Sequence, residues 1–584
     1  MNPLSRRRFV QGLTFATCAG ALWRAPAVLA QSVSPPTLSG ERVDLVVGPA
    51  PFNVTGRARM ATAVNGSVPA PILRLRQGEM VTIDVTNRLA EPTSIHWHGV
   101  RLPADQDGVP GLSFRGIAPG ETFTYRFPIR QAGTYWYHSH SGMQEQTGLY
   151  GALVLVPREP EPYVYDRDYV VMLSDWTDED PMTVVANLKE QSDYYNYHRR
   201  TLATLLEEAS QQGWKATLED RLMWNRVRMQ PTDIMDVTGA TYTFLCNGLP
   251  PAANWTALFR PGERVRLRFI NGSSMTTFDV RIPGLPLTLI AADGNDVEPV
   301  VVDEFRAGVA ETYDVIVEPP RETAYTIFAQ AEDRSGYARG TLAPRTGMAG
   351  MVPPLDPRPL RTMVDMGMAM KATAGMPGMN MSHGDLAKMP ATSAPATNAP
   401  SATRAVPAVN ADGVDPKAMR GTPFVDNLSG NPHDRLAEPG DGLEGDGRRV
   451  LVYTDLKALR PDPDPRAPAR AIEFHLTGNM ERFVWGFDGK KFSAAGPVRV
   501  ALGERVRFVL INDTMMEHPI HLHGFLFSLE NGQEGRLPLK HTVSVKPSGR
   551  LSFVFNADTP GHWAFHCHLL YHMETGMFRT VLVA

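Results

Sequence analysis

The stretch HWAFHCHLLYHMETGM, residues His562 to Met577, contains four histidines, one cysteine and two methionines. On a β-strand, side chains two positions apart share a face, and the side chain between them points to the opposite face. His566 and His568 would therefore lie on one face, with Cys567 on the other. Imidazole and thiolate both bind transition metals, so the pattern favours two metal sites joined by one residue. The alternative is a β-rich core whose polar groups are simply hydrogen-bonded.

Ten of the sixteen histidines fall into four short clusters. The clusters are HWHG (His96, His98), HSH (His138, His140), HPIHLHG (His518, His521, His523) and HCHLLYH (His566, His568, His572). Each His-X-His presents two imidazoles on one face of a strand, as several closely spaced metal ions require. The first and last parts of the chain each supply two clusters, so we expect them to pack face to face.

A second, mononuclear site can be assembled on the opposite face of the same strand. A thiolate, two imidazoles and a weak axial thioether make up a blue-copper site. Cys567, His572 and Met577 come from the closing turn, and His518 comes from the preceding cluster. The strand then connects a copper cluster to a separate copper, an arrangement suited to electron transfer.

Composition limits the class of protein. The chain has 584 residues with a net charge of −4, which gives no sign of a nucleic-acid partner or a basic membrane-binding face. Stretches such as MVTIDVTNRL and ERVRLRFING alternate apolar and polar residues, as β-strands do. We predict an all-β chain in three strand-rich domains, at residues 41–158, 159–345 and 448–584, with a helical insertion at about 185–228 in the second.

Two segments lie outside these domains. Residues 1–30, with SRRRF and small residues before Gln31, are typical of a twin-arginine signal for export to the periplasm. No later run reaches the roughly 20 apolar residues of a membrane span. Residues 346–447 form a biased linker, and its first part holds 8 methionines in 27 residues. That part either binds soft metal ions or is a featureless linker.

The four histidine clusters, in this order and at these spacings, resemble those of three-domain multicopper oxidases over essentially the whole mature chain. TSIHWHGVRLPADQDGVPG, HSHSGMQEQTGLYGALV, FHLTGNMERFVWGFDGKKF and the methionine-rich insertion resemble the copper-resistance protein A branch of that family. The resemblance implies three cupredoxin-like Greek-key β-barrels and four copper ions. The implied ligands are His96 and His521 for type 2 copper; His98, His138 and His568 for one type 3 copper; His140, His523 and His566 for the other; and His518, Cys567 and His572 for type 1 copper, with Met577 axial.

The resemblance also implies a reaction. Electrons from four one-electron oxidations would pass through Cys567 to His566 and His568, and O2 would be reduced to two waters. Asp107 matches the acidic position of the family, although an Asp-Gly turn explains it equally well. Related efflux oxidases carry a proton-relaying glutamate where this chain has Met573, so we expect the neighbouring Glu574 to substitute for it.

The substrate residues are predicted from NDTMMEH, which ends at His518. Met515 and Met516, with Glu517 or Asp513, would let Cu(I) dock beside the type 1 site; the alternative is that the methionines fill a gap in the core. The linker adds further thioether candidates. They are Met363, Met366, Met368, Met370, Met376, Met379 and Met381.

Three functions stay open at this point: a cuprous oxidase that also accepts phenols, a laccase acting mainly on phenols, and a copper-sequestering protein. We expect a monomer that takes O2 as its acceptor and receives copper from periplasmic delivery proteins. Cys246 is predicted to be a buried thiol. Histidines outside the clusters, such as His475 and His541, are predicted to be surface or structural residues.

Overall fold

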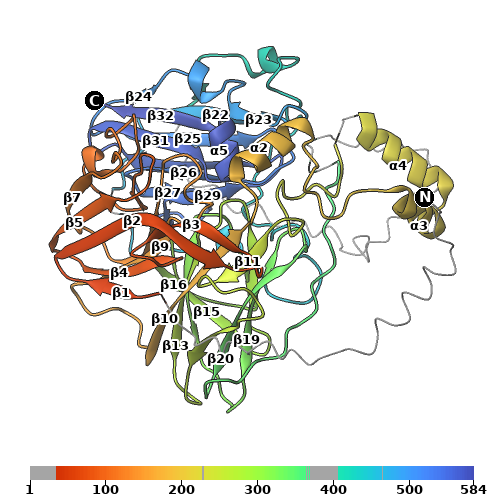
Figure 1. Cartoon of the computed structure of the whole chain (residues 1–584). Coiled ribbons are helices and arrows are strands. Elements are labelled where there is room, and N and C mark those ends of the chain that lie inside the picture. The colour runs from red at the N-terminus through yellow and green to blue at the C-terminus, as the bar shows by residue number, and fades with distance from the viewer. Residues whose placement is uncertain (1–34, 227–228, 364, 366, 368–405, 463) are drawn as a thin grey trace, which may run out of the picture. The chain divides into compact units, whose positions relative to one another are not determined.

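The computed structural model describes residues 35–226, 229–363, 365, 367, 406–462 and 464–584. The predicted signal segment and all the linker methionines named above except Met363 lie outside these residues. Strands dominate the described chain, and Figure 1 shows them in three successive blocks. The prediction of a β-rich chain with a helical insertion in its second part is confirmed.

The first block contains two sheets, in the strand orders β1-β4-β9-β8-β6 and β3-β2-β5-β7. Its strands are β1 (Thr37–Ser39), β2 (Arg42–Asn53), β3 (Ala58–Val64), β4 (Ala70–Arg76), β5 (Met80–Asn87), β6 (His96–His98), β7 (Thr122–Pro128), β8 (Gly133–His138) and β9 (Tyr150–Val156). A 3-10 turn, η1 (Ala104–Gln106), lies between β6 and β7. In β2, Val43, Leu45 and Val47 are buried and alternate with exposed residues, so one face of the strand packs on the core.

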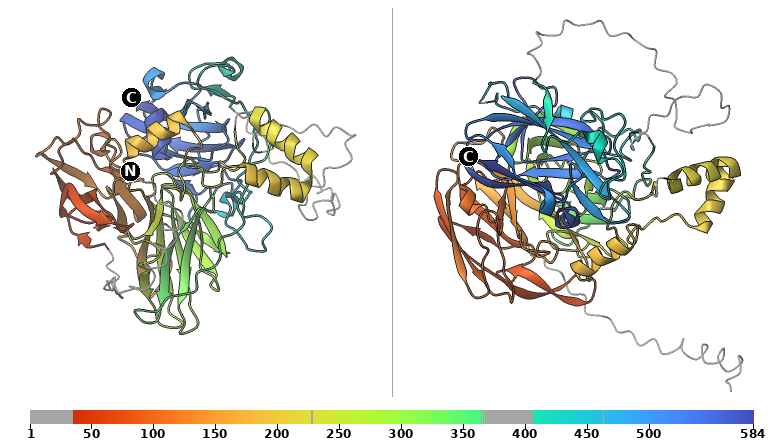
Figure 2. Two further views of the ribbon diagram at one scale, coloured as in Figure 1. Left: turned by 45° about the vertical axis from the view of Figure 1, so that its right-hand side comes forward. Right: turned by 90° about the horizontal axis from the view of Figure 1, so that it is seen from above.

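The second block also has two sheets, β11-β10-β13-β18-β15-β16 and β12-β20-β19-β14-β17. Its strands are β10 (Arg167–Trp176), β11 (Thr243–Cys246), β12 (Trp255–Leu258), β13 (Val265–Asn271), β14 (Phe278–Arg281), β15 (Leu287–Ala292), β16 (Asn295–Val302), β17 (Glu304–Ala307), β18 (Thr312–Val317), β19 (Tyr325–Ala331) and β20 (Tyr337–Ala343). Between β10 and β11 come helices α2 (Pro181–Glu190), α3 (Leu202–Gln212) and α4 (Trp214–Arg226), and both views of Figure 2 show α3 and α4 extending away from the sheets. Thr201 caps α3 by accepting the Thr204 backbone N–H.

The third block repeats the arrangement, with the orders β21-β22-β25-β30-β27-β28 and β24-β32-β31-β26-β29, and β23 pairing with β22. Its strands are β21 (Ala408–Asn410), β22 (Arg470–Asn479), β23 (Val484–Phe487), β24 (Val498–Val500), β25 (Arg505–Asn512), β26 (His518–Leu522), β27 (Phe527–Leu529), β28 (Leu539–Lys540), β29 (Thr542–Val545), β30 (Arg550–Asn556), β31 (Gly561–Cys567) and β32 (Phe578–Val583). Helix α5 (Leu570–Thr575) follows β31 directly. The histidine-rich strands β26 and β31 are therefore neighbours inside one sheet.

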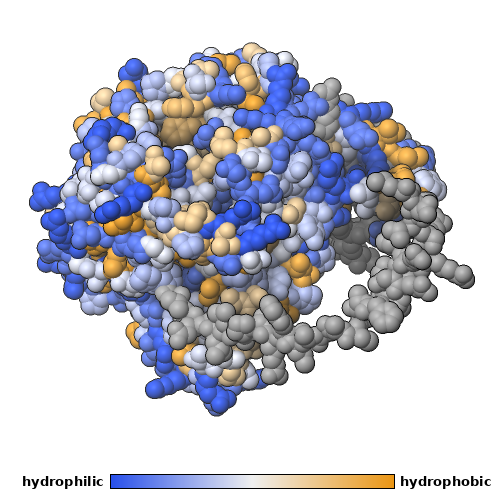
Figure 3. Space-filling model, viewed as in Figure 1, coloured by the Kyte–Doolittle hydropathy of each residue, from blue (hydrophilic) through white to orange (hydrophobic). Residues whose placement is uncertain are grey.

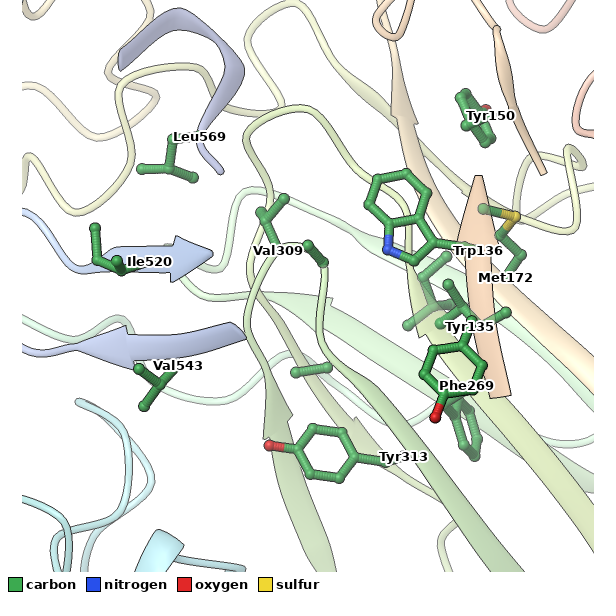
Figure 4. Close-up of a cluster of buried hydrophobic side chains, with 14 of the residues drawn as sticks. Tyr135, Trp136, Tyr150, Met172, Phe269, Val309, Tyr313, Ile520, Val543 and Leu569 are labelled. Atoms are coloured by element: carbon green, nitrogen blue, oxygen red, sulfur yellow. The ribbon is translucent and has the colours of Figure 1, made fainter. Parts of the chain in front are cut away.

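Buried side chains from all three blocks belong to one hydrophobic core. Figure 4 shows Trp136 of the first block, Phe269 and Tyr313 of the second, and Ile520 and Val543 of the third in one region. Each of them is at most 2% exposed. On the face shown in Figure 3, hydrophilic and hydrophobic residues are intermixed. Among the described residues, no helix is both long enough and apolar enough to cross a bilayer.

A buried ionic network joins the first two blocks. The Asp314 carboxylate accepts hydrogen bonds from the Thr134 hydroxyl at 2.9 Å and from Arg266 at 2.5 Å. Arg268 donates to Thr134 at 2.9 Å and lies 3.4 Å from Asp314. Since Arg266, Arg268 and Asp314 are all nearly inaccessible to water, their charges depend on one another.

We expect Asp314→Ala to lower the free energy of unfolding by about 3 kcal/mol, because two buried guanidinium groups lose a shared acceptor. The midpoint of urea unfolding of the copper-free protein measures the change. Arg42→Ala is the control: its partner is Asp84, but the Arg42 side chain is 71% exposed, and loss of such a pair costs below about 1 kcal/mol. Equal losses in the two variants would contradict this interpretation of the network.

Candidate metal centre

The short strand β6 and the strand β8 bring two histidine clusters together. They pair antiparallel, with His96 opposite His138 and His98 opposite Trp136. The ring centroids of His96 and His138 are 5.5 Å apart, and the same distance separates His96 from His140. The two clusters of the first block thus form one group of imidazoles at the end of a sheet.

Strands β26 and β31 do the same for the third block. His521 lies opposite His566, and Ile520 lies opposite Cys567. Backbone hydrogen bonds hold the residues just beyond the pairing, from His523 N–H to the Ala564 carbonyl and from His568 N–H to the Pro519 carbonyl. The register therefore places both clusters beside each other, with Cys567 between its two histidines.

The four groups converge between the first and third blocks, as the ligand pattern predicts. Several sets of three side chains have potential ligand atoms within 4.8 Å of one another and combine histidines of both blocks. Among them are His98 with His138 and His568, His140 with His523 and His566, and His96 with His521 and His523. The first two sets contain the same residues as the two predicted type 3 triads. The rings of His96 and His521, the predicted type 2 pair, have centroids 5.8 Å apart.

The hydrogen-bonding state of these rings fits a metal site. Both ring nitrogens of His98 and of His568 are buried and lack a hydrogen-bond partner among the described residues. The Nε2 atoms of four further histidines are also buried without a partner among these residues. They belong to His96, His138, His140 and His521. An unpartnered buried polar atom costs about 1–3 kcal/mol, so this many in one place would be unfavourable without a ligand. Metal ions would satisfy these nitrogens.

Burial also sets the protonation state of the imidazoles. It lowers the pKa of His98, His138 and His140 well below the usual histidine value, and neighbouring histidines lower it further. It lowers the pKa of His566 to about 4. The rings are therefore neutral at neutral pH, which is the form that binds metals.

Asp107 touches one histidine from each of the two blocks. Its carboxylate lies 2.9 Å from His523 Nδ1 and 3.2 Å from His96 Nδ1, and its carbonyl oxygen lies 2.8 Å from His96 Nδ1. Gly108 permits this approach, because a Cβ at that position would lie 1.8 Å from the Ile95 carbonyl oxygen. The Asp-Gly turn and the carboxylate contact predicted as alternatives are both present.

A second buried carboxylate was missed by the sequence reasoning. Glu145 lies 2.6 Å from His138 Nδ1 through Oε2, and both side chains are 1% exposed. Burial, together with the nearby Asp175, raises the pKa of Glu145 well above its usual value. Glu574, the predicted acid, instead lies on the exposed side of α5. The only sign of Glu145 in the sequence was its position, five residues after His140.

The predicted type 1 residues form a separate group. Cys567 Sγ lies 3.5 Å from His518 Nδ1 and 3.8 Å from His572 Nδ1, and the two nitrogens are 3.2 Å apart. Met577 is fully buried, and its carbonyl oxygen accepts the Cys567 N–H at 3.1 Å. Trp485 stacks on His572 with a centroid distance of 3.9 Å.

Polar partners from the second and third blocks fix the orientation of the type 1 rings. Asp236 of the second block lies 2.7 Å from His572 Nε2, and the Thr514 hydroxyl lies 2.7 Å from His518 Nε2. Both imidazoles therefore direct Nδ1 toward Cys567. Burial raises the pKa of the Cys567 thiol, so a bound metal ion is needed to favour the thiolate. Asp236 lies in a segment without a metal-ligand motif, and nothing in the sequence indicated it.

The predicted Cu(I)-docking residues lie beside this group, but they are not open to solvent. Met515 and Met516 are 0% and 2% exposed. Glu517 lies 3.6 Å from Arg306, and Asp513 lies 2.6 Å from His475 Nδ1. Met363 is also buried. The two carboxylates therefore already contact an arginine or a histidine, whereas Met515 and Met516 belong to the hydrophobic core.

Two residues outside the predicted ligand sets, Cys246 and His541, are both buried. Cys246 is a free, buried thiol, as expected, and burial raises its pKa to about 12. His541, which was predicted to be a surface or structural histidine, is fully buried with its ring centroid 4.8 Å from that of His98. Sequence reasoning missed this neighbour because His541 lies outside every His-X-His pattern.

Comparison with known proteins identifies the family. Three segments match multicopper oxidase families, at residues 47–160, 167–346 and 465–584. The chain is 53% identical to the copper resistance protein A homolog of Pseudomonas syringae pv. tomato, and 52% identical to copper resistance protein A of Escherichia coli. Each alignment covers 99% of both proteins.

Solved structures show the same fold. The multicopper oxidase Fet3p, described as functioning in iron import, aligns with a TM-score of 0.63 at 18% identity and covers 94% of this chain and 90% of its own. A laccase from Botrytis aclada aligns with a TM-score of 0.60 at 21% identity and covers 95% and 89%. The three blocks are thus cupredoxin-like, and this chain belongs to the multicopper oxidase family.

Proposed function

We propose that the protein is a periplasmic cuprous oxidase that serves copper resistance: it oxidises Cu(I) one electron at a time and reduces O2 to water. One observation carries the proposal. Strand β31 places Cys567 against His518 and His572 on one side, while His566 and His568 contact the histidine cluster on the other. A protein that only stores copper has no need of this covalent path.

The resident metal would be four copper ions, in the ligand sets given above. When bound, the type 1 copper would accept electrons from the substrate, and the cluster of three would supply the four-electron reduction of O2. The chain's own contribution is to fix the rings. His572 is held by Asp236, His518 by Thr514, and His138 by Glu145, and partners of this kind orient metal ligands and tune the metal.

Two buried carboxylates are our candidates for handling protons at the cluster. We propose that Asp107 does so between His96 and His523, which belong to different blocks. Glu145 is the better candidate for the second acid than Glu574, because it contacts His138 directly while Glu574 faces solvent. Burial raises the pKa of Glu145, so its carboxyl is suited to holding a proton at neutral pH.

The substrate proposal rests on Met515 and Met516. Thioethers suit Cu(I), and these two immediately precede Glu517 and the type 1 residue His518. Since Arg306 offsets the charge of Glu517, we assign Cu(I) capture to the sulfur atoms rather than to the carboxylate. The names of the two relatives reported above, both copper resistance proteins, support copper as the substrate.

The first test is O2 uptake by the copper-loaded protein with Cu(I) held at low free concentration by a chelating buffer. We expect four Cu(I) oxidised per O2, and no uptake above background for Cys567→Ser. Replacing Met515 and Met516 by leucine, which keeps the side-chain volume, should raise the KM for Cu(I) by about tenfold while phenol oxidation is unchanged.

Deleting residues 368–389, which leaves the buried Met363 in place, tests the linker methionines separately. If that segment supplies Cu(I) to the oxidase, the deletion variant should oxidise Cu(I) more slowly only at low Cu(I) concentration. Normal phenol turnover without Cu(I) turnover would support a laccase instead. Binding of many coppers with turnover of neither substrate would support sequestration.

Asp236→Asn should weaken type 1 copper binding by about 10- to 100-fold, because His572 loses the carboxylate that holds its Nε2. The visible absorption band of the copper-thiolate bond, followed during titration with a copper chelator, measures the change. Asp178→Asn is the control, since that carboxylate bonds instead to Thr55 and to Trp176. Unchanged copper retention in Asp236→Asn would contradict a positioning role.

The copper-free protein should lose stability as the pH falls from 7.5 to 5.5. Histidines of the unfolded chain take up protons near pH 6.5, whereas burial lowers the pKa of His566 and His541 to about 4 in the folded protein. The unfolded state therefore binds more protons in this range, and each such histidine contributes up to about 1.4 kcal/mol per pH unit. Thermal unfolding at several pH values gives the slope. A constant Tm across the range would contradict the assignment of neutral, buried imidazoles.

A further inference from the structure

His541 lies beside His98 and His521 in the histidine cluster although it belongs to no cluster motif. It stands between β28 and β29, and its side chain is completely buried. Its ring centroid is 4.8 Å from that of His98 and 5.7 Å from that of His521. Potential ligand nitrogens of the three residues lie within 4.8 Å of one another.

One edge of the His541 ring is held and the other is left available. Nδ1 lies 3.1 Å from the Thr542 hydroxyl and 3.7 Å from Asp293 Oδ2. Asp293 also accepts the backbone N–H of His541 at 3.1 Å and is paired with the buried Lys540 at 3.1 Å. Nε2 has no hydrogen-bond partner among the described residues. A ring fixed through Nδ1 with a free Nε2 has the hydrogen-bonding pattern of a metal-binding histidine.

The first block leaves space for this ring. Gly99, directly after His98, has φ +80°, and a Cβ there would lie 2.4 Å from His541 Cδ2 and 2.8 Å from His541 Nε2. Any side chain at Gly99 would therefore displace the imidazole. The glycine of HWHG thus has a role beyond its backbone conformation, because it admits a histidine of the third block next to His98.

The same residue orients its neighbour. The carbonyl oxygen of His541 lies 2.6 Å from His521 Nδ1, so it accepts that N–H and leaves His521 Nε2 free. His521 is a predicted type 2 ligand. The backbone carbonyl and the ring of His541 therefore both lie next to His521.

We propose that His541 is an additional copper ligand, whose Nε2 binds on the type 2 side of the cluster next to His521. This inference rests on the proposed function, since it requires the cluster to hold copper. An alternative is that His541 only supports His521 through its carbonyl. That alternative leaves Nε2 buried and unpaired, at a cost of about 1–3 kcal/mol.

Pulsed EPR can count the imidazoles on the type 2 copper. The copper-loaded full chain carrying Cys567→Ser is the suitable protein, because loss of the type 1 copper leaves the type 2 signal free of overlap. We expect three coordinated imidazoles, and two after His541→Gln is added. Gly99→Ala, which removes no imidazole, should also lower the count by displacing the ring. His562→Gln, an exposed histidine on β31, is the control and should leave the count at three.

The ligand assignment would be overturned if the Cys567→Ser protein showed two coordinated imidazoles and the spectrum stayed the same after His541→Gln. That result would leave the proposed function intact. The number of coordinated imidazoles measured before His541 is replaced decides whether His541 is a ligand, so the test holds even if His541→Gln folds poorly. Absence of a type 2 signal, with fewer than three coppers bound per chain, would instead contradict the proposed function itself.

Discussion

The alternation of side chains along β31 is the constraint on which the rest of the site depends. Because successive residues of a strand face opposite ways, Cys567 and the two flanking histidines cannot serve one metal ion. The fold responds by surrounding each face with different partners. On one face, His521 of β26 and the first block complete the histidine cluster. On the other face, His518, α5 and the second block surround the thiol. Two metal environments are thus kept apart, yet they are linked by bonds of the backbone.

The grouping of the clustered histidines could be predicted from the sequence, because side chains two positions apart on a strand share a face. The register of β6 with β8 and of β26 with β31 then brought together the same triads that the family pattern implies. The residues that hold the rings could not be predicted in this way. Asp236 and Glu145 reach their histidines through tertiary contacts that leave no periodic signal. The position of His541 beside His98 could not be predicted for the same reason, since it depends on the space beside Gly99.

Polar residues that contact the predicted ligands or His541 come from every block of the fold. Asp107 belongs to the first block, Asp236 and Asp293 to the second, and Thr514 to the third. Each orients an imidazole or holds the backbone next to one, so the rings are fixed before any metal arrives. This explains why the second block, which supplies none of the predicted copper ligands, is still part of the site. It contributes carboxylates and a packing surface rather than metal donors.

The place of the ligands in the chain has a consequence for biosynthesis. The first donors occur by residue 140, but the last occur after residue 565, and β31 is completed only when β32 pairs along it near the C-terminus. A ribosome must therefore have synthesised residues 566–572 before the proposed type 1 and type 3 sites can close. A truncated product that lacks only its final strand would keep most of its fold-forming sequence and all ten clustered histidines, yet β31 would have an open edge. Pairing of β32 along β31 thus completes the sheet that carries the last donors.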